Sequence, residues 1–157
     1  MPAGSYSRRV LSLDRTIAAA IADHARRDHP DEACGVVAGP AGSDRPVRHV
    51  PMLNAALSPT FYEFDSTELL ALYKEMDARD EEPVVIYHSH TATDAYPSRT
   101  DIALAQEPNA HYVLVSTAGG AHEGEDPLPL RSFRIVDGQV DEEEVRLVDG
   151  AVTGDTE

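Results

Sequence analysis

A short apolar segment, residues 84–87, runs directly into His88-Ser89-His90, and this junction constrains the fold more than any other feature of the sequence. The segment reads Val-Val-Ile-Tyr, and an apolar, β-branched run of this length predicts a buried strand. Side chains alternate between the two faces of a strand, so His88 and His90 are expected to point the same way from its end. Two neutral imidazoles in that arrangement suit a divalent metal such as zinc.

A carboxylate that could complete such a site follows in Ser98-Arg99-Thr100-Asp101, which is expected to begin a short helix that ends near Ala105. If the loop 91–97 folds this turn back over the histidines, two nitrogens and one carboxylate oxygen converge. A fourth position then stays open for water, as in catalytic zinc sites. The same residues also match a capping box, and Asp94 competes with Asp101 as the ligand, so spacing alone leaves both questions open.

A metal-activated water also needs a proton acceptor. Glu32 immediately precedes residues 33–38, which read as a buried strand, and this position could bring its carboxylate to a sheet end beside the metal. Periodicity alone does not single out Glu32 among the acidic residues. Cys34 is the only cysteine and is expected to pack inside that strand as a small hydrophobe rather than to act as a nucleophile. A single cysteine also excludes thiolate-rich zinc sites.

The remaining pattern predicts one α/β domain of mixed strand and helix order. Asp14 and Asp65 are placed to cap helices that end near residues 27 and 80. We place the domain at residues 10–140, after a disordered leader at 1–9 and before an acidic tail at 141–157. Residues 117–128 are expected to form a surface loop. Further strands are predicted at residues 10–13, 33–38, 47–52, 60–64, 111–116, 131–136 and 145–148.

The charge of the chain narrows its partners. It carries 28 acidic and 13 basic residues, for a formal net charge of −15. A field of that sign repels phosphate backbones and anionic lipid surfaces, so binding to nucleic acid or to membranes is disfavoured. No apolar run reaches the roughly 18 residues that span a bilayer. Arg8-Arg9 resembles an export signal, but Asp14 and Arg15 interrupt the apolar region that such a signal needs, so we expect a cytoplasmic protein.

Taken together, Glu32 and the pattern His88-x-His90-x₇-Ser98-x₂-Asp101 resemble the motif of the JAMM, or MPN-plus, metalloproteases. The flanking residues agree, because residues 29–35 are similar to the glutamate segment of that family and Tyr96-Pro97-Ser98 to its approach to the serine. The likeness covers about residues 10–136. The motif is specific, since five functional positions agree in order.

The resemblance implies a role for each of these positions. His88, His90 and Asp101 would bind zinc, and Glu32 would be the general base and acid. Ser98 would hydrogen-bond the substrate carbonyl or its oxyanion. The fold that it implies is a curved, mixed β-sheet flanked by helices, related to the cytidine deaminase fold.

Within the family, the chain is most similar to actinobacterial peptidases that release cysteine from the C-terminus of a ubiquitin-like sulfur-carrier protein. Thr91 stands where many members have proline, which favours this subgroup. The implied function is a zinc metallopeptidase of cysteine biosynthesis that acts on the cysteine adduct of a carrier ending in Gly-Gly. The alternatives are a JAMM isopeptidase that acts on another carrier conjugate and a non-catalytic MPN scaffold. The segments that carry the similarity are residues 25–35, 83–93, 95–101 and 110–117.

Overall fold

The computed structural model describes residues 10–118 and 129–150, in which seven strands form one sheet in the order β1-β7-β6-β5-β4-β2-β3. The expected leader, most of the expected loop 117–128 and the end of the expected tail lie outside the described residues. No helix in the described ranges combines the length and apolar character needed to cross a membrane. The elements are β1 (Val10–Asp14), α1 (Arg15–Asp28), β2 (Cys34–Pro40), β3 (Arg48–Met52), α2 (Ser66–Arg79), β4 (Glu81–His90), α3 (Arg99–Leu104), β5 (His111–Ser116), β6 (Leu130–Val136) and β7 (Gln139–Val148).

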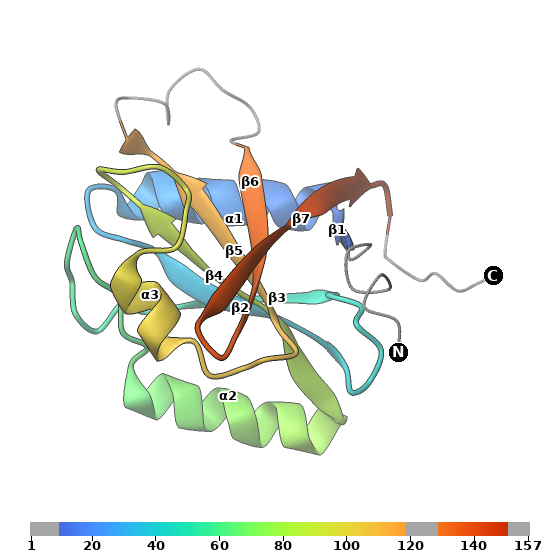
Figure 1. The fold of residues 1–157 in the computed structure, drawn as a ribbon. Coiled ribbons are helices and arrows are strands. Elements are labelled where there is room, and N and C mark those ends of the chain that lie inside the picture. Colours follow the sequence, from blue (N-terminus) through green and yellow to red (C-terminus); the bar gives the residue numbers. More distant parts are fainter. Residues whose placement is uncertain (1–9, 119–128, 151–157) are drawn as a thin grey trace.

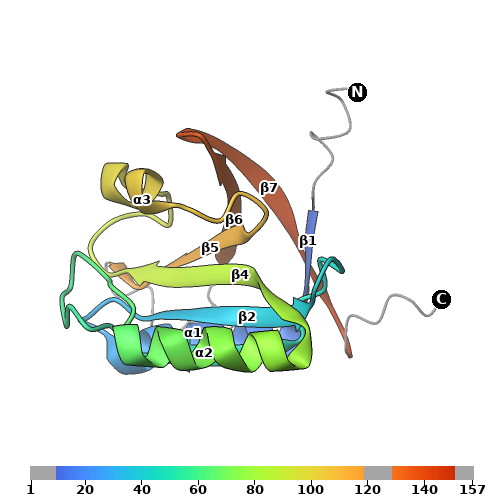
Figure 2. The same cartoon turned by 90° about the horizontal axis from the view of Figure 1, so that it is seen from below.

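The sheet is mixed, which confirms the expected fold class. Strands β4 and β5 run parallel, as do β1 and β7, whereas the other neighbouring strands are antiparallel. Figure 2 shows the curvature, because β2 and β4 cross the view while β7 and β1 rise steeply from them. In Figure 1, α1 lies behind the strands and α3 lies in front of them.

The two faces of β4 serve different parts of the molecule. Val85 and Tyr87 pack into the apolar cluster that contains Ile21 of α1. Ile86 packs on the opposite face, in the cluster that Ile102 of α3 joins. Because successive side chains alternate between faces, the two histidines that end β4 share the face of Ile86 and look toward α3.

Tyr87 explains a glycine in the neighbouring strand. Gly35 pairs with Tyr87 between β2 and β4, and a Cβ at this position would lie 2.4 Å from the Tyr87 hydroxyl oxygen. Glycine is therefore required to leave room for the phenol. The hydroxyl lies 2.7 Å from Nδ1 of His24 and 2.7 Å from Nε2 of His49, so this buried polar group is satisfied on the α1 face of the sheet.

The helix starts follow the capping residues that the sequence indicates. The Asp14 carboxylate accepts a hydrogen bond from the backbone N–H of Thr16 and begins α1. The Asp65 carboxylate accepts from the backbone N–H of Glu68 and begins α2. Each cap satisfies a donor that the first turn of a helix leaves without a partner, so both predicted starts are confirmed.

The strand expected at residues 60–64 is wrong. This stretch forms only an isolated bridge, between Phe64 and Asn54. Part of its backbone binds a side-chain amide, because Asn54 donates to the carbonyl of Phe61 and accepts from the N–H of Glu63. The Glu63 carbonyl accepts one backbone bond across the bridge, from the N–H of Ala55 at 2.7 Å. A side chain that replaces a ladder partner in this way leaves an irregular segment.

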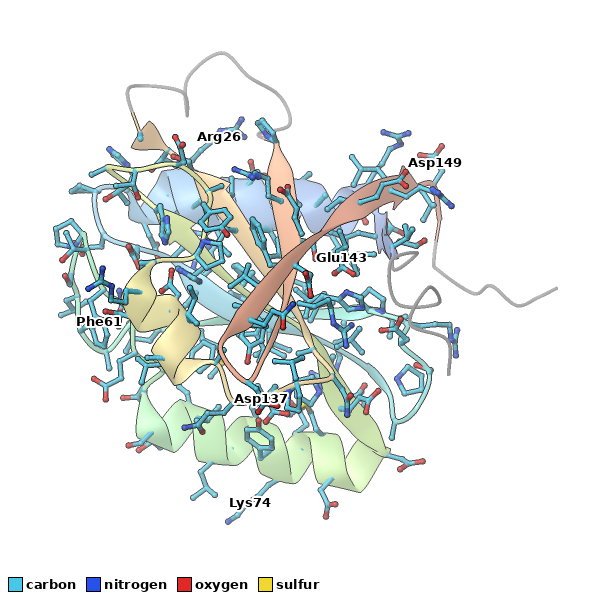
Figure 3. All side chains as sticks on the ribbon, in the orientation of Figure 1. Arg26, Phe61, Lys74, Asp137, Glu143 and Asp149 are labelled. Carbon is cyan, nitrogen blue, oxygen red and sulfur yellow. The ribbon has the colours of Figure 1, made fainter. Side chains whose placement is uncertain are left out.

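Strand β7 begins earlier than the expected strand at residues 145–148. It starts at Gln139 and pairs with β6 on one side and β1 on the other, so residues 141–148 belong to the sheet. One residue of the acidic run 141–144 is buried in this strand. Glu143, labelled on β7 in Figure 3, is buried, whereas Glu142 and Glu144 on either side of it are exposed.

The buried carboxylate belongs to a network at the start of β5. Nδ1 of His111 lies 2.5 Å from Glu143, and its Nε2 lies 2.7 Å from Asp44 in the loop between β2 and β3. Ser132 donates to the same Glu143 oxygen at 2.6 Å. His111 is only 1% exposed. Its buried ring therefore links two carboxylates that are far apart in the sequence.

This network makes the stability of the fold depend on pH. Burial alone would lower the pKa of His111, but its hydrogen bonds to Asp44 and Glu143 outweigh burial and raise that pKa. The stabilisation by the charged ring is complete below the ordinary histidine pKa of about 6.5. It is lost as the pH rises through the raised pKa of the folded protein.

The His111→Asn variant keeps one donor toward Glu143 but cannot carry a charge. We expect it to lose about 3 kcal/mol of unfolding free energy below about pH 6, since removing one partner of a buried ion pair leaves the other uncompensated. Urea unfolding across a pH series measures the difference, which should shrink as the pH rises. A difference that stays constant across the series would contradict the charged state of His111.

Candidate metal centre

Three ligand-type atoms converge where β4 ends. Oδ2 of Asp101, in the first turn of α3, lies 3.1 Å from Nε2 of His88 and 3.0 Å from Nε2 of His90. The two Nε2 atoms are 3.2 Å apart. Among the described residues, this trio forms a group whose ligand atoms all lie within 4.8 Å of one another.

The spacing of these atoms fits a tetrahedral metal. Ligand atoms at about 2.0–2.1 Å from a zinc ion in tetrahedral geometry lie about 3.3 Å from one another. The three observed separations are close to that value. Two nitrogens and one oxygen are also donor types that zinc accepts, and three protein ligands leave a coordination position for water.

The structure decides between the two candidate carboxylates. The side chain of Asp94 is exposed, and its contribution is a backbone one: its carbonyl accepts a 2.7 Å hydrogen bond from Nδ1 of His90. This bond places the proton on Nδ1 and leaves the lone pair of Nε2 directed toward Asp101. Asp101 therefore joins the histidines, whereas Asp94 orients one of them.

The electrostatics suit a cation. Burial lowers the pKa of His88, which keeps its imidazole neutral and able to act as a ligand. Burial would raise the pKa of Asp101, but the close contacts of its carboxylate with His88 and His90 outweigh that effect and hold the pKa well below its usual range. The site thus presents one carboxylate negative charge among buried imidazoles.

Ser98 caps α3, as the sequence indicates, and its hydroxyl hydrogen is not used by the cap. Its Oγ accepts a 3.0 Å hydrogen bond from the N–H of Asp101, and its own N–H donates to Oδ2 of Asp101 at 2.8 Å. These two bonds form a capping box and fix the start of α3 beside the histidines. Because the cap uses Oγ as an acceptor, the Ser98 hydroxyl can still donate its hydrogen to another group.

Glu32 is held next to the histidines by the sheet. The next residue, Ala33, donates its N–H to Oγ of Ser89 at 2.8 Å, and Ser89 donates its N–H to the carbonyl of Ala33 at 3.0 Å. Cys34 then pairs with His88 between β2 and β4. Glu32 is only 5% exposed, and burial raises its pKa to about 7. A carboxyl group with that pKa can both accept and release a proton near neutral pH.

Cys34 behaves as the sequence predicts. It is fully buried among apolar residues of β2 and α2, and burial raises the pKa of its thiol to about 12. A thiol with that pKa remains protonated at neutral pH and is a poor nucleophile.

Two residues of the site escape the sequence patterns, and both belong to the segment 53–65. The buried Asn54 amide donates to the carbonyls of Glu32 and Phe61, each at 3.0 Å. The ring of Tyr62 stacks on the imidazole of His88, with centroids 4.4 Å apart and planes inclined by 24°. The sequence signal was an asparagine and an aromatic residue in a segment without helical or strand periodicity, and that does not distinguish a site residue from a loop residue.

Comparison with known proteins gives a consistent picture. The family of prokaryotic homologs of the JAB domain matches residues 14–136. The chain is 62% identical over 140 residues to a CysO-cysteine peptidase of Mycobacterium tuberculosis, which covers 89% of this chain and 92% of the relative. It is 34% identical over 120 residues to a desampylase of Haloferax volcanii, which covers 72% and 86%. A solved structure of a Desulfitobacterium hafniense protein superposes with a TM-score of 0.76 at 30% identity and covers 93% of this chain and 97% of that one.

Proposed function

The chain belongs to the JAB domain family, the JAMM/MPN group of peptidases, and from this premise we propose that it is a zinc enzyme that releases cysteine from a ubiquitin-like sulfur-carrier protein. The observation that carries the proposal is the convergence of Oδ2 of Asp101 with two histidine Nε2 atoms beside the buried Glu32. The name of the relative at 62% identity supports the substrate class.

In this proposal His88, His90 and Asp101 hold the metal. Bound zinc would polarise the scissile carbonyl and lower the pKa of a bound water to about 7. Glu32 accepts a proton from the attacking water and returns it to the amine of cysteine as the C–N bond breaks. Its pKa of about 7, which burial produces, suits both transfers.

Ser98 supplies the third function. Its Oγ is fixed by the N–H of Asp101, at 3.0 Å, and its hydroxyl hydrogen can donate to the substrate carbonyl oxygen. A donor that is already in place when negative charge develops on that oxygen stabilises the transition state without further reorganisation. The cap therefore positions the helix and the oxyanion donor together.

The substrate is expected to be a carrier that ends in Gly-Gly and bears cysteine on its C-terminal carboxyl group. We place the reaction in cysteine biosynthesis and in the cytoplasm, where a single unpaired thiol such as Cys34 fits a reducing environment. The 34% identity to a desampylase favours a second candidate, hydrolysis of an amide between a carrier and another protein.

A carrier–cysteine adduct distinguishes these candidates. With zinc bound, the enzyme is expected to reduce the mass of the adduct by one cysteine residue, as followed by intact-protein mass spectrometry. A chelator should stop the reaction, and added zinc should restore it, because the proposed reaction needs the metal to polarise the carbonyl and to activate the water. The matched control is the same carrier joined to a lysine side chain of a test protein. Cleavage of that conjugate without cleavage of the cysteine adduct would contradict the proposal and favour the second candidate.

A further inference from the structure

Among the described residues, the imidazole of His88 has no partner for the contact that usually orients a metal-ligating histidine. Nδ1 of such a ring normally donates to a carboxylate or carbonyl, and this fixes the plane of the ring. His90 follows the rule through the carbonyl of Asp94. Nδ1 of His88 is buried and has no hydrogen-bond partner within residues 10–118 and 129–150. No hydrogen bond at Nδ1 from these residues therefore orients the ring of His88.

Tyr62 contacts the face of this ring. The two rings are stacked, with centroids 4.4 Å apart and planes inclined by 24°. Phe64 packs edge-on against Tyr62 on the same segment, with centroids 5.6 Å apart and planes at 69°. A ring held against the face of an imidazole limits rotation about its χ2 angle, which is the torsion that swings Nε2 away from the metal position.

The segment that carries Tyr62 is itself fixed to the site. The Asn54 amide nitrogen donates to the carbonyls of Glu32 and Phe61. Its oxygen accepts from the N–H groups of Ala56 and Glu63. Glu32 donates its N–H to the carbonyl of Ser58 at 2.9 Å. Asn54 is only 3% exposed, so these bonds are shielded from water.

A second attachment joins the segment to the end of β4. Thr91, which directly follows His90, donates its hydroxyl to the carbonyl of Pro59 at 2.7 Å. Phe61, labelled in Figure 3, lies on the same side of the molecule as α3. Tyr62 is therefore part of a segment that is bonded to both Glu32 and the residue after the second histidine, and it is not a loosely packed surface ring.

We propose that Tyr62 is a positioning residue of the metal centre, whose ring holds the imidazole of His88 from its face where a hydrogen bond holds His90 at its edge. The inference rests on the proposed function of the site. The aromatic ring of Tyr62, and not its hydroxyl, holds the imidazole in place. The segment 53–65 thus acts on two parts of the centre, because Asn54 fixes the backbone of Glu32 and Tyr62 fixes a ligand.

Zinc affinity measured by competition with a chromophoric chelator tests the proposal on the full chain without any substrate. The Tyr62→Leu variant is expected to bind zinc about 10–100-fold more weakly, the usual cost of losing an outer partner of a ligand. Tyr62→Phe keeps the ring and should bind zinc as the wild type does. Tyr73→Leu, on α2 and 42% exposed, is the matched control and should also leave the affinity unchanged.

Thermal unfolding of the metal-free proteins separates positioning from a general loss of structure. Tyr62→Met, whose flexible side chain fills similar space, is measured in parallel so that a poorly folded leucine variant does not end the test. If the folded Leu and Met variants bind zinc as tightly as the wild type, the proposal is overturned. It is also overturned if the Phe variant is weakened as much as the Leu variant, because the hydroxyl would then carry the effect.

The outcome is independent of the substrate. A wild type that binds zinc but leaves the carrier–cysteine adduct intact contradicts the proposed function, while the affinities of the Tyr62 variants still decide the role of the ring. Conversely, if the wild type cleaves the adduct and the Leu and Met variants bind zinc with unchanged affinity, Tyr62 has no positioning role and the proposed function is still supported.

Discussion

The Glu32→Gln variant is expected to hydrolyse the carrier–cysteine adduct about 10²–10⁴-fold more slowly than the wild type, the usual contribution of a general acid–base group. Glutamine has nearly the same shape, so the backbone bonds of Glu32 to Ser58 and Asn54 should survive. The amide cannot accept a proton from water or return one to the leaving amine. Zinc content should not change, because Glu32 is not among the three converging ligands.

Turnover and elemental analysis are therefore measured on the same preparation. Glu144→Gln is the matched control, since that side chain is exposed on β7 and its nearest partner is Arg146 at 3.4 Å. It should behave as the wild type in both measurements. If Glu32→Gln retained full turnover at full zinc occupancy, another group would have to move the proton and the assignment of Glu32 would be wrong.

The histidine pair was predictable from the sequence because its geometry is local. Two residues that end an apolar strand share a face whatever the rest of the fold does, so His88 and His90 follow from period two alone. The carboxylate was not predictable from spacing in this way. Asp94 and Asp101 are both within reach of the strand end, and the decision depends on where α3 returns, which the capping box of Ser98 and Asp101 fixes.

The segment 53–65 shows why other parts escaped prediction. Residues 60–64 have the aromatic content of a strand, but the Phe61 carbonyl and the Glu63 N–H bind side-chain atoms of Asn54. A side chain that substitutes for a strand has no periodic signature. The stacking of Tyr62 on His88 depends on the same irregular path, so the sequence pattern contains neither the loop nor the contact.

The acidic run at residues 141–144 illustrates a different limit. Its composition is typical of a solvated tail, and the −15 charge of the chain encourages that interpretation. Pairing of β7 with β6 on one side and β1 on the other makes the run a strand. Burial of Glu143 is possible because His111 and Ser132 donate to it. Those donors lie on β5 and β6, so the partner that permits burial cannot be seen within the run itself.

The His88→Ala variant is expected to lose stoichiometric zinc and, with it, all hydrolysis. One nitrogen and one carboxylate oxygen remain, and two protein ligands do not make the three-ligand set of a catalytic zinc site. Asp101→Asn is a second variant that can still accept the N–H of Ser98 but no longer offers a charged ligand, so it should also bind zinc more weakly. Unfolding of both variants without metal shows whether the fold is preserved.

Asp94→Ala provides the contrast that makes the ligand assignment specific. The Asp94 side chain is exposed, and the bond to His90 comes from its backbone carbonyl, which alanine retains. Zinc content measured by elemental analysis should therefore stay stoichiometric in Asp94→Ala and fall in Asp101→Asn and His88→Ala. The reverse order for the two aspartates would mean that the loop 91–97 rearranges when metal binds, because only then could the Asp94 carboxylate reach the histidines. Undiminished zinc in His88→Ala would exclude this imidazole as a ligand and, with it, the orienting role of the ring that stacks on it.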